Sequence, residues 1–304
     1  KPFESRRRGR GRARDAGLSP PRVRAHPPRG ALYIRGGAKA AFPRSPRRPP
    51  AGGGRPQWPV AEMGDHPWFL VHHREDAPGS NAGMVQDLVH SGSLRSDECI
   101  AAFQAVDRQN FWPAETGGKL AYADMPLRSG RLHLSAPHIY AKALESLLPL
   151  RPGLSFLNVG SGTGYFNSIV AELTGPSATN HGVEIWPETL AHADKCCAAL
   201  GKSFIKFTVG NVYQLDVNTT IRYDRIYLGA CANSKSKYLY RLLEVGGILI
   251  GPFQVGHAQQ LRRVVRQSET QFNVELLGSV QFASLLEPMP APPPPPPPPP
   301  PLPA

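Results

Sequence analysis

A glycine loop with the sequence G-S-G-T-G spans residues 160–164, directly after the apolar segment 154–159. Glycines at the end of a buried strand let the backbone approach a ligand closely, and open α/β sheets bind ligands at the carboxyl ends of their strands. Glu184 stands twenty residues after the loop, at the end of the next expected strand. A carboxylate there can accept hydrogen bonds from both hydroxyls of a ribose. The loop and Glu184 together predict a nucleoside site, whereas the loop alone would also fit a structural strand–turn–helix connection.

The spacing of the three glycines, Gly160, Gly162 and Gly164, narrows the choice of nucleoside. The dinucleotide pattern G-x-G-x-x-G is absent, because Tyr165 and Phe166 follow the loop. A G-x-G-x-G loop suits a cofactor without a pyrophosphate. S-adenosyl-L-methionine has a ribose and an adenine but no phosphate, so it is the expected cofactor.

Asn211 and Val212 follow the third expected strand. In a parallel sheet that strand end lies on the same edge as the glycine loop. A side-chain amide and a backbone N–H at this corner would therefore face the adenine edge of the cofactor. Taken alone, Asn211 is explained equally well as a turn residue.

Short apolar runs alternate with helical patterns over the second half of the chain. The expected strands are residues 154–159, 181–185, 204–209, 223–228 and 247–251, and the expected helices between them are 165–173, 187–200 and 235–243. Strands that alternate with helices predict an α/β fold with a doubly wound, mostly parallel sheet. Residues 261–265 and 272–282 should extend one edge of the sheet as a hairpin.

An N-terminal helical extension is expected before the sheet. Residues 81–90 and 96–106 have amphipathic helical patterns, whereas residues 122–134 are expected to be irregular. Ser135 is the expected N-cap of the helix that follows, because Pro137 stands where a missing N–H costs nothing.

The two ends of the chain differ in composition from its middle. The first sixty residues hold 16 Lys and Arg and only two acidic residues, Glu4 and Asp15. Their net charge of +14 (16 less 2) exceeds the net charge of +12 of the whole chain. This segment is too poor in aliphatic residues to bury a core. Residues 292–301 are ten consecutive prolines, which favour a polyproline II rod. We therefore expect a disordered arm at 1–62, one folded domain at 80–287 and a polyproline tail at 288–304.

Three interpretations of the basic arm remain open: nucleic-acid contact, an organelle transit peptide, and translated upstream sequence, since the first methionine is Met63. Nucleic-acid binding rests on this arm alone and is not expected of the folded domain. The proline tail could dock an SH3-, WW- or profilin-type partner, or have none.

Four cysteines without metal-ligand or disulfide spacing favour a reducing, cytoplasmic location. No apolar run approaches the length of a membrane span.

From residue 88 to 286 the sequence resembles the protein-L-isoaspartate O-methyltransferase family. Besides the glycine loop, the matching stretches are AVDRQNF at 105–111, AYADMPL at 121–127, LSAPHIYA at 134–141, GVE at 182–184, YDRIYLGA at 223–230 and VGGILIGP at 245–252. The LSAPH stretch is the most diagnostic one, because methyltransferases in general lack it.

The resemblance implies a Rossmann-like, class I S-adenosylmethionine-dependent methyltransferase domain that methylates isoaspartyl carboxylates of damaged proteins. It implies Ser135 at the catalytic centre, with His133 and Leu134 beside it at the acceptor. The residues implied to hold the methyl donor are Asn158, Gly160, Gly162, Gly164, Glu184, Asn211, Val212 and Tyr140. A carboxylate is already ionised at pH 7 and needs no general base, so Ser135 would orient the acceptor and would not act as a covalent nucleophile.

Three positions depart from the family pattern. Asn158 and Asn211 stand where the family has aspartate, and Tyr140 stands where it has a second histidine. The same changes resemble the isoaspartate O-methyltransferase domain-containing branch, whose animal members add a C-terminal box that recruits a ubiquitin ligase. This chain runs into proline instead. The alternative function is therefore a catalytically weak or inactive, cofactor-binding recognition or adaptor module of the same fold.

Overall fold

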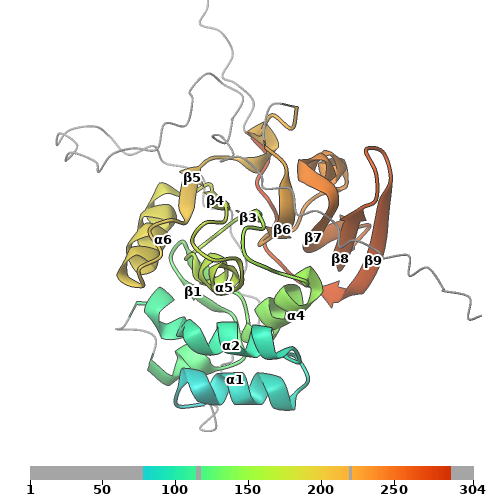
Figure 1. The fold of residues 1–304 in the computed structure, drawn as a ribbon. Coiled ribbons are helices and arrows are strands. Elements are labelled where there is room, and N and C mark those ends of the chain that lie inside the picture. The colour runs from blue at the N-terminus through green and yellow to red at the C-terminus, as the bar shows by residue number, and fades with distance from the viewer. Residues whose placement is uncertain (1–77, 114–117, 219–220, 289–304) are drawn as a thin grey trace, which may run out of the picture.

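The structure, a computed structural model, describes residues 78–113, 118–218 and 221–288. Predictions for the basic arm at 1–62 and for the prolines at 292–301 lie outside these residues. A seven-stranded sheet with the order β5-β4-β3-β6-β7-β8-β9 runs through the described part (Figure 1). The strands are β3 Phe156–Val159, β4 Asn180–Glu184, β5 Lys206–Val209, β6 Tyr223–Leu228, β7 Leu243–Val255, β8 Ala258–Arg266 and β9 Phe272–Val280.

The parallel part of the sheet consists of the neighbouring strands β5, β4, β3, β6 and β7. Strands β8 and β9 continue the sheet in antiparallel fashion. This confirms the doubly wound, mostly parallel sheet and its edge hairpin. Strand β3 pairs with β4 on one side and with β6 on the other. The chain therefore adds β4 and β5 on one side of β3, and the later strands on the opposite side. Sheets of this kind form a crevice outside the carboxyl ends of the strands at such a switch point.

Within the described residues five α-helices surround the sheet: α1 Asn81–His90, α2 Asp97–Ala105, α4 Pro137–Leu147, α5 Tyr165–Thr174 and α6 Pro187–Ala199. Helices α1 and α2 lie outside α4 and α5, with α2 packed against α5 (Figure 1), which confirms the N-terminal helical extension. Short 3-10 helices connect the remaining elements: η2 Arg108–Phe111, η3 Gly118–Tyr122, η4 Val212–Gln214 and η5 Ser234–Leu242. None of the helices in the described residues is long and apolar enough to cross a membrane.

The alternation of side chains along β3 divides the core in two. Phe156 belongs to the cluster that also holds the apolar faces of α1, α2, α4 and α5, whereas Leu157 and Val159 belong to the cluster on the opposite face of the sheet. Asn158 therefore points to the same side as Phe156, toward α5. All four residues of β3 are buried, as expected for a parallel strand covered on both faces.

Three local predictions are corrected by the structure. Residues 122–134, expected to be irregular, contain the hairpin β1 Leu127–Ser129 and β2 Leu132–Leu134. The N-cap of α4 is Ala136 and not Ser135, because a residue before proline is forced into an extended conformation, here ψ 142°. The expected α-helix at 235–243 is the 3-10 helix η5, whose longer rise per residue reaches β7 at the very next residue.

Candidate cofactor and acceptor site

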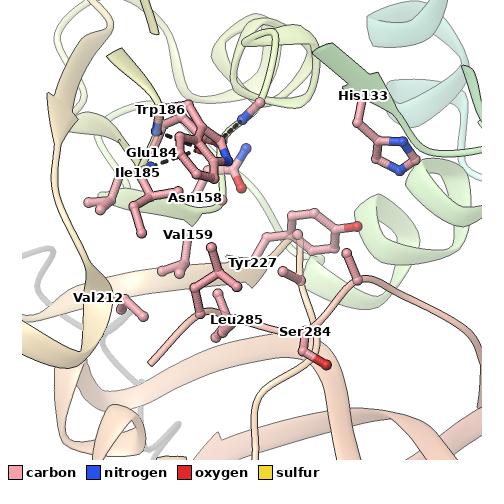
Figure 2. A pocket seen from close by; sticks show the side chains of 18 of the residues that line it. His133, Asn158, Val159, Glu184, Ile185, Trp186, Val212, Tyr227, Ser284 and Leu285 are labelled. Atoms are coloured by element: carbon pink, nitrogen blue, oxygen red, sulfur yellow. Dashed lines mark hydrogen bonds between the residues drawn. The ribbon is translucent and has the colours of Figure 1, made fainter. Parts of the chain in front are cut away.

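A cleft of about 290 Å³ opens at the carboxyl ends of the central strands, where the switch point predicts it. Nine of the sequence-predicted site residues line it: His133, Ser135, Tyr140, Asn158, Gly160, Gly162, Glu184, Asn211 and Val212. Leu134 and Gly164 do not line it. Figure 2 shows Glu184 and Asn158 on one side of the cleft and His133 on the other. We call the side around Glu184 and Val212 the adenosyl half, and the side around His133 and Ser135 the acceptor half.

The glycine loop turns sharply at the end of β3. Gly160, Gly162 and Gly164 all have positive φ, at 69°, 55° and 82°, a region that other residues rarely adopt. A Cβ on Gly164 would lie 3.0 Å from Cys197 Sγ and from the Phe207 ring. This glycine therefore lets α5 pack against α6 and β5.

Gly229, at the end of β6, packs backbone to backbone against the loop. Its N–H donates to the Val159 carbonyl at 2.7 Å, and a Cβ on it would lie 2.5 Å from the Gly160 carbonyl oxygen. The two neighbouring strand ends thus form one continuous floor of the cleft. The sequence showed Gly229 only as part of a family-like stretch, and no spacing rule marked it as a site residue.

Glu184 ends β4 and binds the glycine loop directly. Its Oε2 accepts from the Gly162 N–H at 3.0 Å, and its Oε1 accepts from the N–H groups of Ile185 and Trp186 at 2.8 and 3.2 Å. Burial raises the pKa of this carboxyl, and the three N–H donors oppose that rise. A carboxylate has about four acceptor positions, so about one remains for a ribose hydroxyl while the loop stays bound.

Asn211 and Val212 line the cleft, and the Asn211 amide is already engaged. Its Oδ1 accepts from the Tyr213 N–H at 3.0 Å, which caps η4, and its Nδ2 donates to the Leu286 carbonyl at 2.9 Å. The side chain therefore holds the chain segment 283–286 against the cleft, and its donor is taken up by the Leu286 carbonyl. Val212 is buried and lines the cleft.

The segment 283–286 is a wall of the cleft that the sequence did not reveal. All four of its residues line the cleft, and Figure 2 shows Leu285 near Val159 and Val212. Two backbone hydrogen bonds to Cys231 hold this segment. The Leu285 N–H donates to the Cys231 carbonyl at 2.8 Å, and the Cys231 N–H donates to the Ala283 carbonyl at 2.7 Å. Such a contact between distant chain segments has no local signal in the sequence.

The acceptor half is built where hairpin β1–β2 leads into α4. Ser135 is 7% exposed, and its backbone N–H donates to the Tyr140 hydroxyl at 3.2 Å. Tyr140 is thus a support for the Ser135 segment. Burial, with the charges of Arg128 and Arg108 adding to it, lowers the pKa of His133 to about 4, so its imidazole is neutral at pH 7.

Tyr227 is a further lining residue that was not singled out from the sequence. It stands on β6 directly beside Asn158 of β3. Its hydroxyl is buried without a hydrogen-bond partner within the described residues, and burial holds its pKa well above the usual value. Tyr227 therefore stays a neutral hydroxyl in the wall of the cleft.

The cleft matches the chemistry of S-adenosyl-L-methionine. The Asn158 Oδ1 and Ser161 Oγ atoms are buried without a partner among the described residues, so each can bond to a polar group of a ligand. Glu184 offers an acceptor for a ribose hydroxyl, and Ile185 and Val212 offer apolar contacts for an adenine ring. The described residues hold no group of three or more potential metal-ligating side chains.

The sheet order, the glycine loop at the switch point and the acid that ends β4 define a class I S-adenosylmethionine-dependent methyltransferase fold. The crystal structure of a protein described as a protein-L-isoaspartate O-methyltransferase from Plasmodium falciparum, in complex with S-adenosyl-L-homocysteine, shares this fold. Its TM-score is 0.62 at 24% identity, over 69% of this chain and 99% of that chain.

Residues 79–288 match the family model of protein-L-isoaspartate(D-aspartate) O-methyltransferase. A protein-L-isoaspartate O-methyltransferase of Methanothermobacter thermautotrophicus is 34% identical over 207 residues, 67% of this chain and 93% of the relative. Protein-L-isoaspartate O-methyltransferase 1 of Arabidopsis thaliana is 35% identical over 213 residues, 67% of this chain and 90% of the relative. The chain belongs to the protein-L-isoaspartate (D-aspartate) O-methyltransferase family, which confirms the resemblance seen in the sequence.

Proposed function

We propose that this protein is an S-adenosylmethionine-dependent carboxyl methyltransferase that acts on L-isoaspartyl (D-aspartyl) residues of damaged proteins. The observation that carries this proposal is the meeting of the Ser135 segment and the glycine loop in one cleft. A Cβ on Gly162 would lie only 3.3 Å from the His133 carbonyl oxygen, so the two segments are in close contact. Family membership supports the same activity, and favours an enzyme over a recognition module without turnover.

The reaction needs no proton transfer. An oxygen of the acceptor carboxylate forms a bond to the methyl carbon while the bond between that carbon and sulfur breaks, and the products are a methyl ester and S-adenosyl-L-homocysteine. Adenosylmethionine would supply the methyl group on a sulfonium sulfur, which would leave as a neutral thioether. A negative and a positive charge cancel along this path, so a cleft of low polarity that excludes water favours the transfer.

The residues of the chain then bind and position the reactants. Glu184 and the glycine loop hold the nucleoside, and Ser135, kept in place by Tyr140, orients the acceptor carboxylate. A neutral His133 avoids an extra cation that would stabilise the carboxylate in the ground state. Most of the rate enhancement comes from holding oxygen, methyl and sulfur in line.

An activity assay with labelled adenosylmethionine and an isoaspartyl peptide tests this proposal. The wild type should transfer a base-labile label to the peptide, and the Gly162→Arg variant should not, because arginine at positive φ would strain the loop and fill the cleft. Gly246→Arg is the matched control, since Gly246 also has positive φ but faces open space. A wild type without label above the Gly162→Arg background would disprove the proposal.

The domain limits and the location are part of the same proposal. We infer that residues 80–287 form the methyltransferase domain, which the family match at 79–288 supports. A cytoplasmic location is supported by four buried, free cysteines. Burial raises the pKa of Cys99 and of Cys197 to about 12 and keeps both thiols protonated.

An SH3-, WW- or profilin-type partner of the proline tail stays a prediction, which a pull-down with and without residues 290–304 would test.

A further inference from the structure

A second groove lies at the edge of the sheet that is formed by β9 (Figure 1). It has a volume of about 440 Å³, and among the described residues none lines both this groove and the cleft. Its lining comes from η5, β8 and β9 and consists of Lys237, Tyr240, Gln260, Arg262, Phe272, Val274 and Leu276. We call it the edge groove.

The apolar side of the edge groove comes from alternate residues of β9. Phe272, Val274 and Leu276 point to one face of the sheet, because side chains alternate along a strand. Val274 and Leu276 are 45% and 60% exposed, so the described residues leave this apolar strip largely uncovered. Phe272 packs against Tyr240 of η5, with ring centroids 5.6 Å apart. Aromatic rings in a groove are the surface on which polyproline II segments dock.

The polar side chains of the edge groove are hydrogen-bond donors. Lys237 and Arg262 are cations, and none of the described residues that line the groove is acidic. Gln260 Oε1 accepts from the Arg262 Nε and Nη2 atoms at 3.1 and 2.7 Å, which leaves the Gln260 amide nitrogen as a donor. A run of prolines has no N–H and presents only carbonyl acceptors. The polar groups of the groove therefore complement a proline-rich segment.

The chain leaves the described part of the domain beside η5. Asn233 Nδ2 donates to Glu287 Oε1 at 2.7 Å, and Asn233 directly precedes η5. At about 2.0 Å per residue of a 3-10 helix, Tyr240 lies about 14 Å further along. The proline run at 292–301 begins five residues after Glu287. In polyproline II conformation those residues span about 16 Å and the run itself about 31 Å, so the run is long enough to lie along the edge groove.

Attachment to the same chain favours this occupant over a free one. A polyproline II segment loses little entropy when it docks, because its conformation is already formed. A short linker gives an effective concentration of about 1 mM, so a Kd of about 100 µM for the free segment would already fill the groove to about 90%. Weak docking is therefore sufficient.

We propose that the edge groove binds the proline run at 292–301 of the same chain. The aromatic pair and the apolar strip of β9 contact the pyrrolidine rings, and Lys237, Gln260 and Arg262 donate to proline carbonyls. The docked run covers apolar surface at the edge of the sheet that otherwise faces water. An SH3-, WW- or profilin-type partner then has to compete with the groove for the same prolines.

A pair of cysteines in the full chain tests where the proline run lies. Leu276→Cys is combined with Ala291→Cys, directly before the run, and the four native cysteines are buried. This pair should form a disulfide within one chain at least about 10-fold faster than the same pair in a chain whose residues 292–301 are replaced by glycine and serine. Tryptic peptides analysed by mass spectrometry measure the rate. Asn273→Cys with Ala291→Cys is the control for the opposite face of β9 and should not depend on the run.

Two results of this experiment would overturn the proposal. Equal rates with and without the prolines would show that the run does not dock at the edge groove. A disulfide that joins two chains would show that the run docks on a second copy and not on its own chain.

Binding of labelled decaproline, measured by fluorescence anisotropy, tests the groove itself. The glycine–serine chain has an open groove and should bind decaproline about 10-fold more tightly than the wild type, whose own run competes. Leu276→Asp in the glycine–serine chain should weaken this binding at least about 5-fold, because aspartate brings only acceptors. Val255→Asp, at another exposed apolar residue outside the groove, is the matched control. Equal binding by the wild type and the glycine–serine chain, or no binding by either, would refute the proposal.

Discussion

The two halves of the cleft are built in different ways. The adenosyl half is made of consecutive strand ends: the glycine loop follows β3, Glu184 ends β4 and Val212 follows β5. The acceptor half joins the hairpin β1–β2 to Tyr227 of β6, and segment 283–286, close to the last described residues, also lines the cleft. A site made of strand ends follows from the order of the sheet, whereas a site made of distant segments depends on how those segments pack. Variants of the two halves should therefore fail in different ways.

The largest expected effect belongs to the floor of the adenosyl half. Gly229→Ala places a Cβ 2.5 Å from the Gly160 carbonyl oxygen, and backbone atoms cannot move aside cheaply. We expect a loss of at least about 100-fold in affinity for adenosylhomocysteine, or about 2.7 kcal/mol, with a lower Tm. Gly79→Ala, where φ is not positive and a Cβ meets nothing within 4 Å, is the control. Wild-type affinity in Gly229→Ala would show that the floor is not rigid.

His133 should make the stability of the folded domain sensitive to acid. Its folded-state pKa of about 4 lies below the ordinary 6.5, so the unfolded chain binds more protons between these values. Stability due to this group is therefore lost as the pH falls from 6.5 toward 4, by roughly 2 kcal/mol at pH 5. Urea unfolding of the wild type and of His133→Gln at pH 7.5 and pH 5 measures it. An equal loss of stability in both proteins would contradict the low pKa.

Ser135→Ala should separate catalysis from cofactor binding. The Ser135 hydroxyl lies in the acceptor half, while its backbone N–H, which the variant keeps, holds the bond to Tyr140. We expect kcat for the isoaspartyl peptide to fall about 10-fold, the size of one lost orienting hydrogen bond, with unchanged affinity for adenosylhomocysteine. If cofactor affinity fell by the same factor, the division of the cleft into two halves would be wrong.

Asn211→Asp should give the smallest effect, because it alters a wall and not the floor. A carboxylate keeps the acceptor for the Tyr213 N–H but cannot donate to the Leu286 carbonyl. We expect the dissociation rate of adenosylhomocysteine to rise about 3-fold to 10-fold, measured by stopped-flow fluorescence. Asn211→Gln, which retains a donor, should recover part of the difference. A slower dissociation from Asn211→Asp would favour a direct bond from residue 211 to adenine.

Sequence reasoning was sufficient where the chemistry is local. The glycine loop and Glu184 could be predicted because strand, turn and carboxylate lie within thirty residues, and the sheet follows from the alternation of strands and helices. It did not reveal the packing of Gly164 against Cys197 and Phe207, which depends on α6 and β5. It failed also for the hairpin in residues 122–134, which is too short to show a periodic pattern.

The direction of side-chain bonds was equally beyond the sequence. Asn158 and Asn211 could be recognised as departures from a family pattern, but their partners could not be. The Asn158 amide donates to the buried Asn167 Oδ1, and the Asn211 amide donates to the Leu286 carbonyl. Both amides donate where a carboxylate could not, so the change of charge also changes what each side chain can hold in place.

The backbone contact between Gly229 and Gly160 also bears on how a bulky substrate enters. With no side chain between the two strand ends, the floor has nothing that can rotate or swing aside. We therefore expect the motion that admits a protein chain to come from the hairpin at residues 127–134 and from segment 283–286, which also line the cleft. Amide protons of these two segments should exchange with solvent faster than those of β3 and β6, because the floor of the cleft is rigid and the two segments beside it move.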